Sequence, residues 1–317
     1  MKALPFFISI ALLAGCSAPD ATRSVQSSHD ADKVVTFVDY QLFTPNGQKV
    51  SLSALPDDFT EADVILVGEW HTHTGIHRFQ IDLLKQLNSK SAKLALSMEQ
   101  FTRDKQTIVD EYLQSSIGEQ TLIKEANAWP NYESDYRPLV EFAKVSGIDV
   151  IASNAPKSIV RCIGRQGLSY LDKLDTSERQ FVASNIDISP SPYKDKFMAS
   201  MHHGDEELTR KQFAAQLTWD ATMAESIVHY LEQHPGHQVM HIAGKFHTEN
   251  GLGTAAQIQS LNPKLSVIVI TPVESISDNT QDYQLEVLAP PVRYVKKDNQ
   301  MKAYQNLHSR NDTLVCK

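Results

Sequence analysis

Polar side chains that could bind a metal ion or transfer protons follow the longest apolar runs of this sequence. They are Glu69 and His71 after the run 63–67, Glu99 after 93–97, Asn154 after 148–153, and His247 after 238–243. Carboxylates and imidazoles bind divalent metals and are also the usual general acids and bases of enzymes. Glu69, His71, Glu99 and His247 are therefore candidate metal ligands or, if the protein is an enzyme, candidate catalytic residues.

The apolar runs themselves predict how these side chains are positioned. They do not alternate with polar residues, a fifth run covers 266–270, and helical spacing follows in 76–87 and 104–113. Unbroken apolar strands are typical of a mostly parallel sheet that is covered on both faces by helices. In an open sheet of this kind the carboxyl ends of the strands meet at one edge, where ligands bind. We expect an α/β fold with a mostly parallel central sheet flanked by helices, and the polar residues gathered in one cleft.

The sequence predicts two further segments, a hairpin and a helical insertion. Residues 34–43 and 49–52 flank the turn Pro45-Asn46-Gly47 and are typical of a β-hairpin. Residues 156–233 form a long helical insertion between the third and fourth strands, interrupted at Pro190-Ser191-Pro192. We expect a single α/β domain over 34–317 that contains this insertion.

Several of these residues also have simpler explanations. Glu69 alone could stabilise the start of the following helix. His73 and His77 could share a helix face or be solvated, and His234 and His237 flank Pro235-Gly236 as expected of turn residues.

Two further patterns argue against common enzyme classes. Gly251-Leu252-Gly253 with Ala256 matches part of a dinucleotide-binding motif, but it stands seven residues after its strand and is better explained as the start of a helix. The sequence contains no Gly-x-Ser-x-Gly, which argues against a serine hydrolase.

The N-terminus predicts export and lipidation. Lys2 precedes the apolar run 3–13, and Leu13-Ala14-Gly15-Cys16 resembles the cleavage box of a bacterial lipoprotein. We expect a signal peptide over 1–15, acyl chains such as palmitate on Cys16, and a flexible tether over 16–33, which is rich in Ser, Ala and Asp. Ser17 in place of Asp favours the outer membrane of the cell envelope. An ordinary signal peptide with an incidental cysteine is the alternative.

The net charge bears on the class of binding partner, and the cysteine content bears on disulfide formation. The net charge of −8 argues against a nucleic-acid partner. Cys162 and Cys316 are the two other cysteines, and in an oxidising compartment they could form a disulfide or remain as two buried thiols.

Four short motifs make the sequence similar to a known family. They are Val67-Gly68-Glu69-x-His71, Met98-Glu99-x-Phe101-x-Arg103, Ala215-Gln216-x-x-x-Asp220-x-x-Met223-Ala224 and Ala243-Gly244-x-x-His247. Together they resemble the ChaN-like lipoproteins of the haem-binding uptake/Tiki superfamily over roughly residues 60–295. The resemblance implies haem binding in bacterial iron acquisition. Its remoter relatives, erythromycin esterases and Tiki metalloproteases, imply metal-dependent hydrolysis by the Gly-Glu-x-His and Gly-x-x-His residues.

The helical insertion carries residue types that suit haem. Tyr193 or His202 could reach the iron, while Lys194 or Lys196 could meet a propionate. Tyr193 could instead simply pack the insertion onto the sheet. The sequence has no Cys-x-x-Cys-His, so covalent haem attachment is not expected.

Three hypotheses follow from the sequence. The first is a haem-binding lipoprotein of iron uptake, held on the membrane by its anchor, with an outer-membrane haem receptor and a second copy of the chain as further candidate partners. The second is a Tiki- or esterase-like metallohydrolase that uses Glu69, His71, Glu99 and His247. The third is a structural envelope lipoprotein with a degenerate site.

Overall fold

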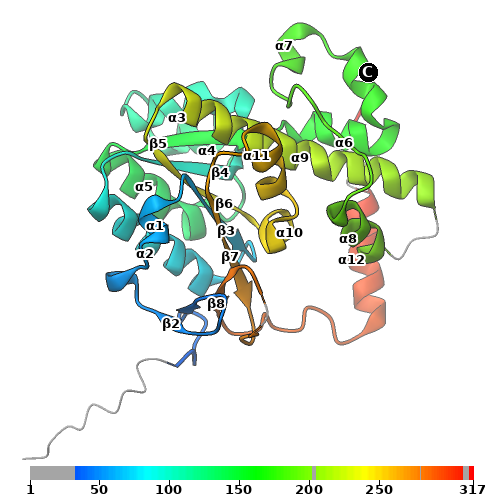
Figure 1. Cartoon of the computed structure of the whole chain (residues 1–317). Coiled ribbons are helices and arrows are strands. Elements are labelled where there is room, and N and C mark those ends of the chain that lie inside the picture. Colours follow the sequence, from blue (N-terminus) through cyan, green and yellow to red (C-terminus); the bar gives the residue numbers. More distant parts are fainter. Residues whose placement is uncertain (1–32, 202–204, 279, 310–313) are drawn as a thin grey trace, which may run out of the picture. The chain divides into compact units, whose positions relative to one another are not determined.

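A mixed eight-stranded sheet forms the centre of the chain (Figure 1). The computed structural model describes residues 33–201, 205–278, 280–309 and 314–317, so Cys16 and His202 lie outside the described residues. The strands are β1 (Gln41–Phe43), β2 (Lys49–Val50), β3 (Val64–Glu69), β4 (Leu94–Thr102), β5 (Asp149–Asn154), β6 (Gln238–Gly244), β7 (Val267–Val273) and β8 (Tyr283–Glu286). Their order is β2-β1-β8-β7-β3-β6-β4-β5.

The pairing of these strands confirms the predicted fold class. Strands β3 to β8 pair in parallel with one another, and β1 runs antiparallel to both β2 and β8. The predicted hairpin pairs only Leu42 and Phe43 with β2. Strand β8 was not predicted, because four residues without an apolar run give no clear signal.

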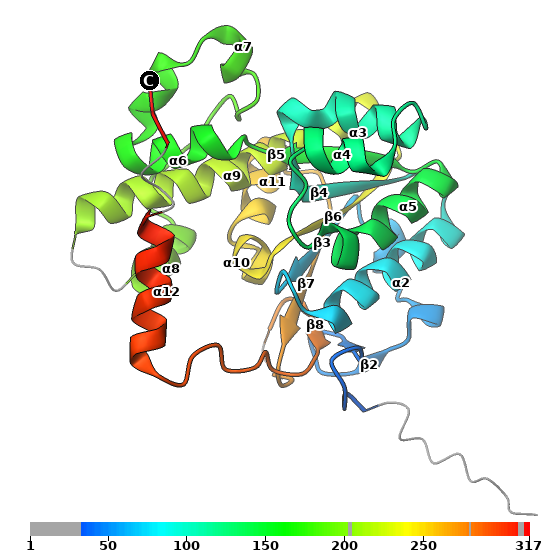
Figure 2. The same cartoon turned by 180° about the vertical axis from the view of Figure 1, so that it is seen from behind.

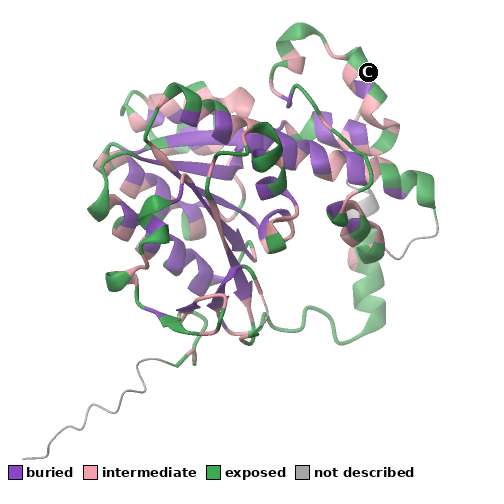
Figure 3. Cartoon of the chain, in the orientation of Figure 1, coloured by how far each residue is buried: buried purple, intermediate pink, exposed green. Residues whose placement is uncertain are grey.

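Helices cover both faces of the sheet, which explains the unbroken apolar runs. Along β3, Ile65 and Val67 pack with α2 (Thr74–Lys90), α3 (Gln106–Leu113), α4 (Glu119–Glu125) and α5 (Arg137–Ser146). Val64 and Leu66 pack on the other face with α9 (Glu206–Gln233) and α11 (Thr254–Leu261). Figure 2 shows the first group in front of the sheet, and Figure 3 shows that the strands and the inward helix faces are buried.

The predicted helical insertion lies between β5 and β6. Its helices are α6 (Lys157–Gln166), η5 (Leu168–Lys173), α7 (Thr176–Arg179), α8 (Pro192–Ser200) and α9. Pro192 opens α8, where its fixed φ suits the first turn, and the side chain of Ser191 accepts from the backbone N–H of Lys194 at 3.2 Å. Helix α9 is long enough to pack on the sheet through Ile227 and on the insertion through Phe213.

The remaining elements are short helical segments and the helix α12, which comes after the last strand in the sequence. They are η2 (Leu52–Ala54), α1 (Asp58–Glu61), η3 (Arg103–Lys105), η4 (Tyr132–Tyr136), α10 (Lys245–Thr248), η6 (Glu249–Gly251) and α12 (Lys297–Ser309). Helix α11 begins directly after Gly253, as the sequence predicts. None of the helices in the described ranges is long and apolar enough to cross a membrane.

A disulfide joins Cys162 of α6 to Cys316 near the C-terminus. The sequence allowed either a disulfide or two free thiols, and the structure contains the disulfide. Residues 33–317 group as one compact unit.

Candidate active site

Glu69 is the last residue of β3, and its side chain is fully buried. Both carboxylate oxygens accept hydrogen bonds from side chains: Oε1 from Tyr136 (2.6 Å), His71 (2.9 Å) and Gln100 (3.1 Å), and Oε2 from Gln80 (2.7 Å). Burial opposes ionisation, but the bond from His71 and the nearby His77 outweigh it and lower the pKa of Glu69. Glu69 is therefore held as an anion by protein donors. It does not cap α2, because no side chain caps the start of that helix.

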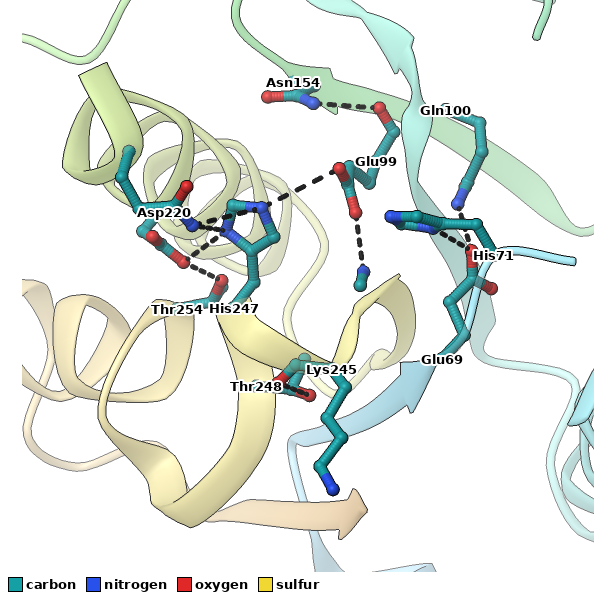
Figure 4. Close-up of polar contacts among 12 residues, drawn as sticks. Glu69, His71, Glu99, Gln100, Asn154, Asp220, Lys245, His247, Thr248 and Thr254 are labelled. Carbon is teal, nitrogen blue, oxygen red and sulfur yellow. Dashed lines mark hydrogen bonds and ion pairs between the residues drawn. The ribbon is translucent and has the colours of Figure 1, made fainter. Parts of the chain in front are cut away.

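His71 follows β3 in the loop before α2. Its Nδ1 faces Oε1 of Glu69, and its ring meets the ring of Trp129 edge-on with 4.9 Å between centroids. The side chain is 44% exposed, and Figure 4 shows the ring reaching from Glu69 toward Glu99. Burial acts to lower the pKa of His71, but the hydrogen bond to Glu69 and the charge of Glu99 raise it overall. Because Nδ1 is occupied, Nε2 is the nitrogen available for chemistry.

His247 lies on α10, directly after β6, and forms a second histidine–carboxylate pair. Its Nδ1 is 3.0 Å from Oδ1 of Asp220, a fully buried residue of α9. Asp220 also accepts hydrogen bonds from Thr254 at 2.9 Å and from Tyr193 at 2.7 Å. Burial acts against the charged imidazole, but Asp220 and Glu99 raise the pKa of His247 to about 9. His247 is thus a buried imidazolium at neutral pH.

Glu99 lies between the two pairs (Figure 4). Its Oε2 accepts from the backbone N–H of Gly244 at 2.6 Å, and its Oε1 is 3.8 Å from Nε2 of His247. Asn154 has a different task, because its amide donates to the backbone carbonyl of Glu99 at 3.0 Å and fixes the strand end. The four candidate side chains thus gather at the carboxyl edge of the sheet, and Asn154 stabilises the backbone at Glu99.

The metal hypothesis finds no support in the described part of the chain. Among the described residues, no group of three or more His, Cys, Asp and Glu side chains could hold a metal ion. One physical reason is that Glu69 has both oxygens engaged by protein donors. The arrangement suits acid/base chemistry instead, with an imidazolium and a carboxylate within 3.8 Å of each other.

The structure disfavours Tyr193 as an iron ligand. Its side chain is buried, with the residue 3% exposed, and its hydroxyl donates to Asp220 and accepts from Gln216 at 3.0 Å. Burial and the charge of Asp220 raise the pKa of Tyr193, so the phenolate that iron prefers is costly here. Tyr193 packs α8 against Phe213 and Phe246, which is the simpler alternative weighed above.

Lys194 is also engaged away from the candidate site. Its Nζ donates to the backbone carbonyl of Ile188 at 2.8 Å. Lys196, the other candidate for a propionate, forms an ion pair with Glu249 at 2.8 Å. His202 remains a prediction, because it lies outside the described residues.

Sequence reasoning gave no role to several residues that shape the site. Asp220 stands in the third family motif and is the only charged residue among the buried residues of α9, which is a signal that could have indicated its role. Tyr136 and Gln100 gave no such signal. Gly244 matters for its missing side chain, because a Cβ there would lie 2.8 Å from Cε1 and 2.9 Å from Nε2 of His71. This contact explains the glycine of the Gly-x-x-His motif.

Comparison with known proteins finds a family match that includes the candidate site. The family described as "Haem-binding uptake, Tiki superfamily, ChaN" matches residues 55–258, which include both histidine–carboxylate pairs. The chain belongs to this family. A solved structure of ChaN from Campylobacter jejuni, described as showing cofacial heme binding, has a TM-score of 0.60 and 18% identity. The similarity covers 79% of this chain and 98% of the ChaN chain and shows a shared fold.

Two more distant similarities accompany this ChaN-family fold. An erythromycin esterase in its open conformation has a TM-score of 0.44 and 11% identity, covering 84% of this chain and 86% of the esterase. The protein RETICULATA-RELATED 5 of Arabidopsis thaliana chloroplasts is 23% identical over 205 residues. That match takes in 60% of this chain but spans only 27% of the plant protein.

Proposed function

We propose that this ChaN-family chain is a haem-binding lipoprotein of the bacterial cell envelope that serves iron uptake. Membership of a haem-binding family supports the ligand. The lipoprotein-like sequence that ends at Cys16 supports anchoring to a membrane, with the outer membrane favoured by Ser17. An outer-membrane haem receptor is the partner that such a role would require.

His71 is the axial ligand that the geometry favours, and this observation carries the proposal. Haem iron takes a neutral imidazole nitrogen, and an imidazole whose other nitrogen donates to a carboxylate is well oriented and more basic. His71 has this second arrangement, since its Nδ1 is 2.9 Å from Oε1 of Glu69, and its side chain is 44% exposed. The ring of Trp129 beside it offers an apolar surface for a porphyrin.

Haem titration of a soluble form, residues 17–317, tests this assignment by absorbance. His71→Ala should abolish or shift the ferric bands, while Tyr193→Phe, which keeps the buried ring, should leave them in place. The reverse result would restore Tyr193 as the ligand. If both variants bind normally, His202→Ala tests the remaining histidine, and a wild-type protein without a specific spectrum would refute haem binding.

A second copy of the chain is the partner we propose for the haem-bound form. The relative from Campylobacter jejuni is described as binding heme cofacially, which places two groups face to face. If haem is shared in this way here, adding it should convert monomers to dimers. Size-exclusion chromatography coupled to light scattering, with and without haem, measures that change directly.

The paired histidines favour one alternative function, hydrolysis by acid/base catalysis. In this scheme Glu99 accepts a proton from water, and His247, whose pKa is raised to about 9, donates one to the leaving group. Model esters and amides assayed by mass spectrometry would reveal such activity. Glu99→Gln and His247→Ala should then each reduce the rate by roughly 100-fold or more. An equal rate in wild type and both variants would exclude this mechanism.

A further inference from the structure

Residues 288–304 form a surface segment between the last strand and the disulfide. This basic segment comprises a loop and the first part of α12. Before it, Val287 is buried and its backbone N–H donates to the carbonyl of Val273 at 3.0 Å. After it, Cys316 is bonded to Cys162 of α6. Folded protein therefore holds the chain on both sides of the segment, and Figures 1 and 2 show α12 at the periphery beside α8.

The basic segment exposes a concentration of large apolar side chains. The described residues include thirteen exposed large apolar side chains, and five of them lie within this one segment. They are Val292 (79% exposed), Tyr294 (45%), Val295 (92%), Met301 (46%) and Tyr304 (41%). None belongs to a buried hydrophobic cluster of the described structure, and Figure 3 shows the loop and most of α12 as exposed. Single exposed apolar residues are ordinary, but a concentration of them marks an interaction surface.

Basic side chains are interleaved with these apolar ones. They are Arg293, Lys296, Lys297 and Lys302, all exposed and without an ion-pair partner among the described residues. Asp298 is the only acidic residue of the segment, so four positive charges and one negative charge give it a net charge of +3. The whole chain has the opposite sign, with a net charge of −8. The segment is therefore a local positive surface that attracts anionic partners.

The order of residues in α12 separates these two kinds of group only partly. Lys297, Met301 and Tyr304 are spaced four and three residues apart, so they share one face of the helix. Lysine can lay its apolar stem along such a face while its ammonium group extends beyond it. Tyrosine suits the boundary between an apolar phase and water for a similar reason. Mixed basic and apolar groups of this kind are typical of segments that lie in the headgroup region of a bilayer, which requires no shaped pocket.

We propose that the basic segment binds the surface of a membrane that contains anionic phospholipids. The exposed valines, tyrosines and Met301 enter the headgroup region, while the arginine and lysines meet the lipid phosphates. This contact is additional to the lipid anchor proposed above. It uses neither Cys16 nor haem, so it is tested separately from both.

Flotation of vesicles with the soluble form, residues 17–317, tests the proposal without the lipid anchor. This form retains every described residue. The probes are vesicles of phosphatidylcholine alone and vesicles that also contain about 30% phosphatidylglycerol, whose headgroup is anionic. We expect the protein to bind the anionic vesicles at least about tenfold more tightly than the neutral ones. Binding should weaken in high salt, because salt screens the attraction between exposed charges.

Two variants assign the contact to the basic segment. Replacing its four basic residues by Gln should weaken binding to the anionic vesicles by roughly 100-fold, since each such residue contributes roughly fivefold. Val292→Ser combined with Val295→Ser should weaken binding by about tenfold, because less apolar surface enters the membrane.

Matched controls carry the same kinds of change elsewhere on the surface. Val145→Ser replaces a valine of α5 that is 78% exposed. The charge control replaces four exposed lysines outside the segment by Gln, namely Lys85, Lys90, Lys93 and Lys264. Both controls should bind the anionic vesicles as the wild type does.

Three results would overturn the proposal: no binding to anionic vesicles, equal binding to both kinds of vesicle, or equal losses in the variants and their controls. Light scattering of the haem-free protein tests a second copy of the chain as the occupant. A dimer that is lost in the Val292 and Val295 double variant would assign the segment to that copy and would also overturn membrane binding. None of these results decides the haem titration or the fractionation of the Cys16→Ser protein, which test the proposed function.

Discussion

Nδ1 of His247 lies 3.0 Å from Oδ1 of Asp220, although the two residues come from separate helices, α10 and α9. Both side chains are almost completely buried, and the carboxylate keeps the imidazole charged. This ion pair joins the insertion to the carboxyl edge of the sheet, so its protonation state affects both the stability of the fold and the chemistry of the site.

The charge of His247 predicts that stability falls in mildly alkaline solution. The pKa is raised from 6.5 to about 9, so the folded protein holds this proton more tightly than the unfolded chain does. The contribution is fully present below about pH 6.5 and is lost as the pH rises through about 9. The free energy of unfolding should drop by up to about 3 kcal/mol over this range. Denaturant titrations at several pH values measure the drop, and His247→Gln should flatten it.

Glu69 should control the basicity of His71. Glu69→Gln keeps the size of the side chain but removes the negative charge 2.9 Å from Nδ1. We expect the raised pKa of His71 to fall, because its hydrogen bond to a carboxylate and the attraction of that charge are both weakened. NMR titration of the His71 ring protons in both proteins measures this. An unchanged pKa would mean that Glu99 alone sets the basicity of His71.

Gly244→Ala should displace the ring of His71. The new Cβ would lie 2.8 Å from Cε1 of that ring, so either the imidazole or the strand end must move. We expect a loss of roughly 1–3 kcal/mol in stability and weaker haem binding. Calorimetry and haem titration measure the two effects. Gly118→Ala is the control, since nothing lies within 4 Å of its Cβ position; similar losses in both variants would contradict the explanation.

The disulfide should contribute substantially to stability. Cys316→Ala removes the link to Cys162 across 154 residues of sequence, which frees the unfolded chain. We expect the free energy of unfolding to fall by roughly 2–4 kcal/mol, as measured in guanidinium chloride. The C-terminal residues should also become accessible to carboxypeptidase. Unchanged unfolding in Cys316→Ala would show that the bridge adds little to the packing around α6.

Lipidation can be tested in cells. Cys16→Ser removes the thiol that would carry the acyl chains, so the protein should move from the membrane fraction to the soluble fraction. Immunoblots of fractions washed in high salt measure the shift, and Cys162→Ala should leave the distribution unchanged. Retention of the Cys16→Ser protein on membranes would contradict the lipoprotein assignment.

The sequence alone determined the sheet and the edge where the site lies. Strands buried on both faces need unbroken apolar runs, and the polar residues Glu69, Glu99 and His247 fall at the carboxyl ends of such runs. In a parallel sheet those ends share one edge, so the gathering of these residues follows from pattern and chain order. The short strand β8 was not predicted, because it lacks such an apolar run.

Only the tertiary structure decided what each side chain does at that edge. Asp220, Tyr193 and Gly244 acquire their roles through contacts between elements far apart in the chain. Such contacts depend on how α8 and α9 are rotated and placed against the sheet, and a local sequence pattern does not specify that placement. The same reason explains why residue types suited to haem led to Tyr193, whose hydroxyl the folded chain directs to Asp220.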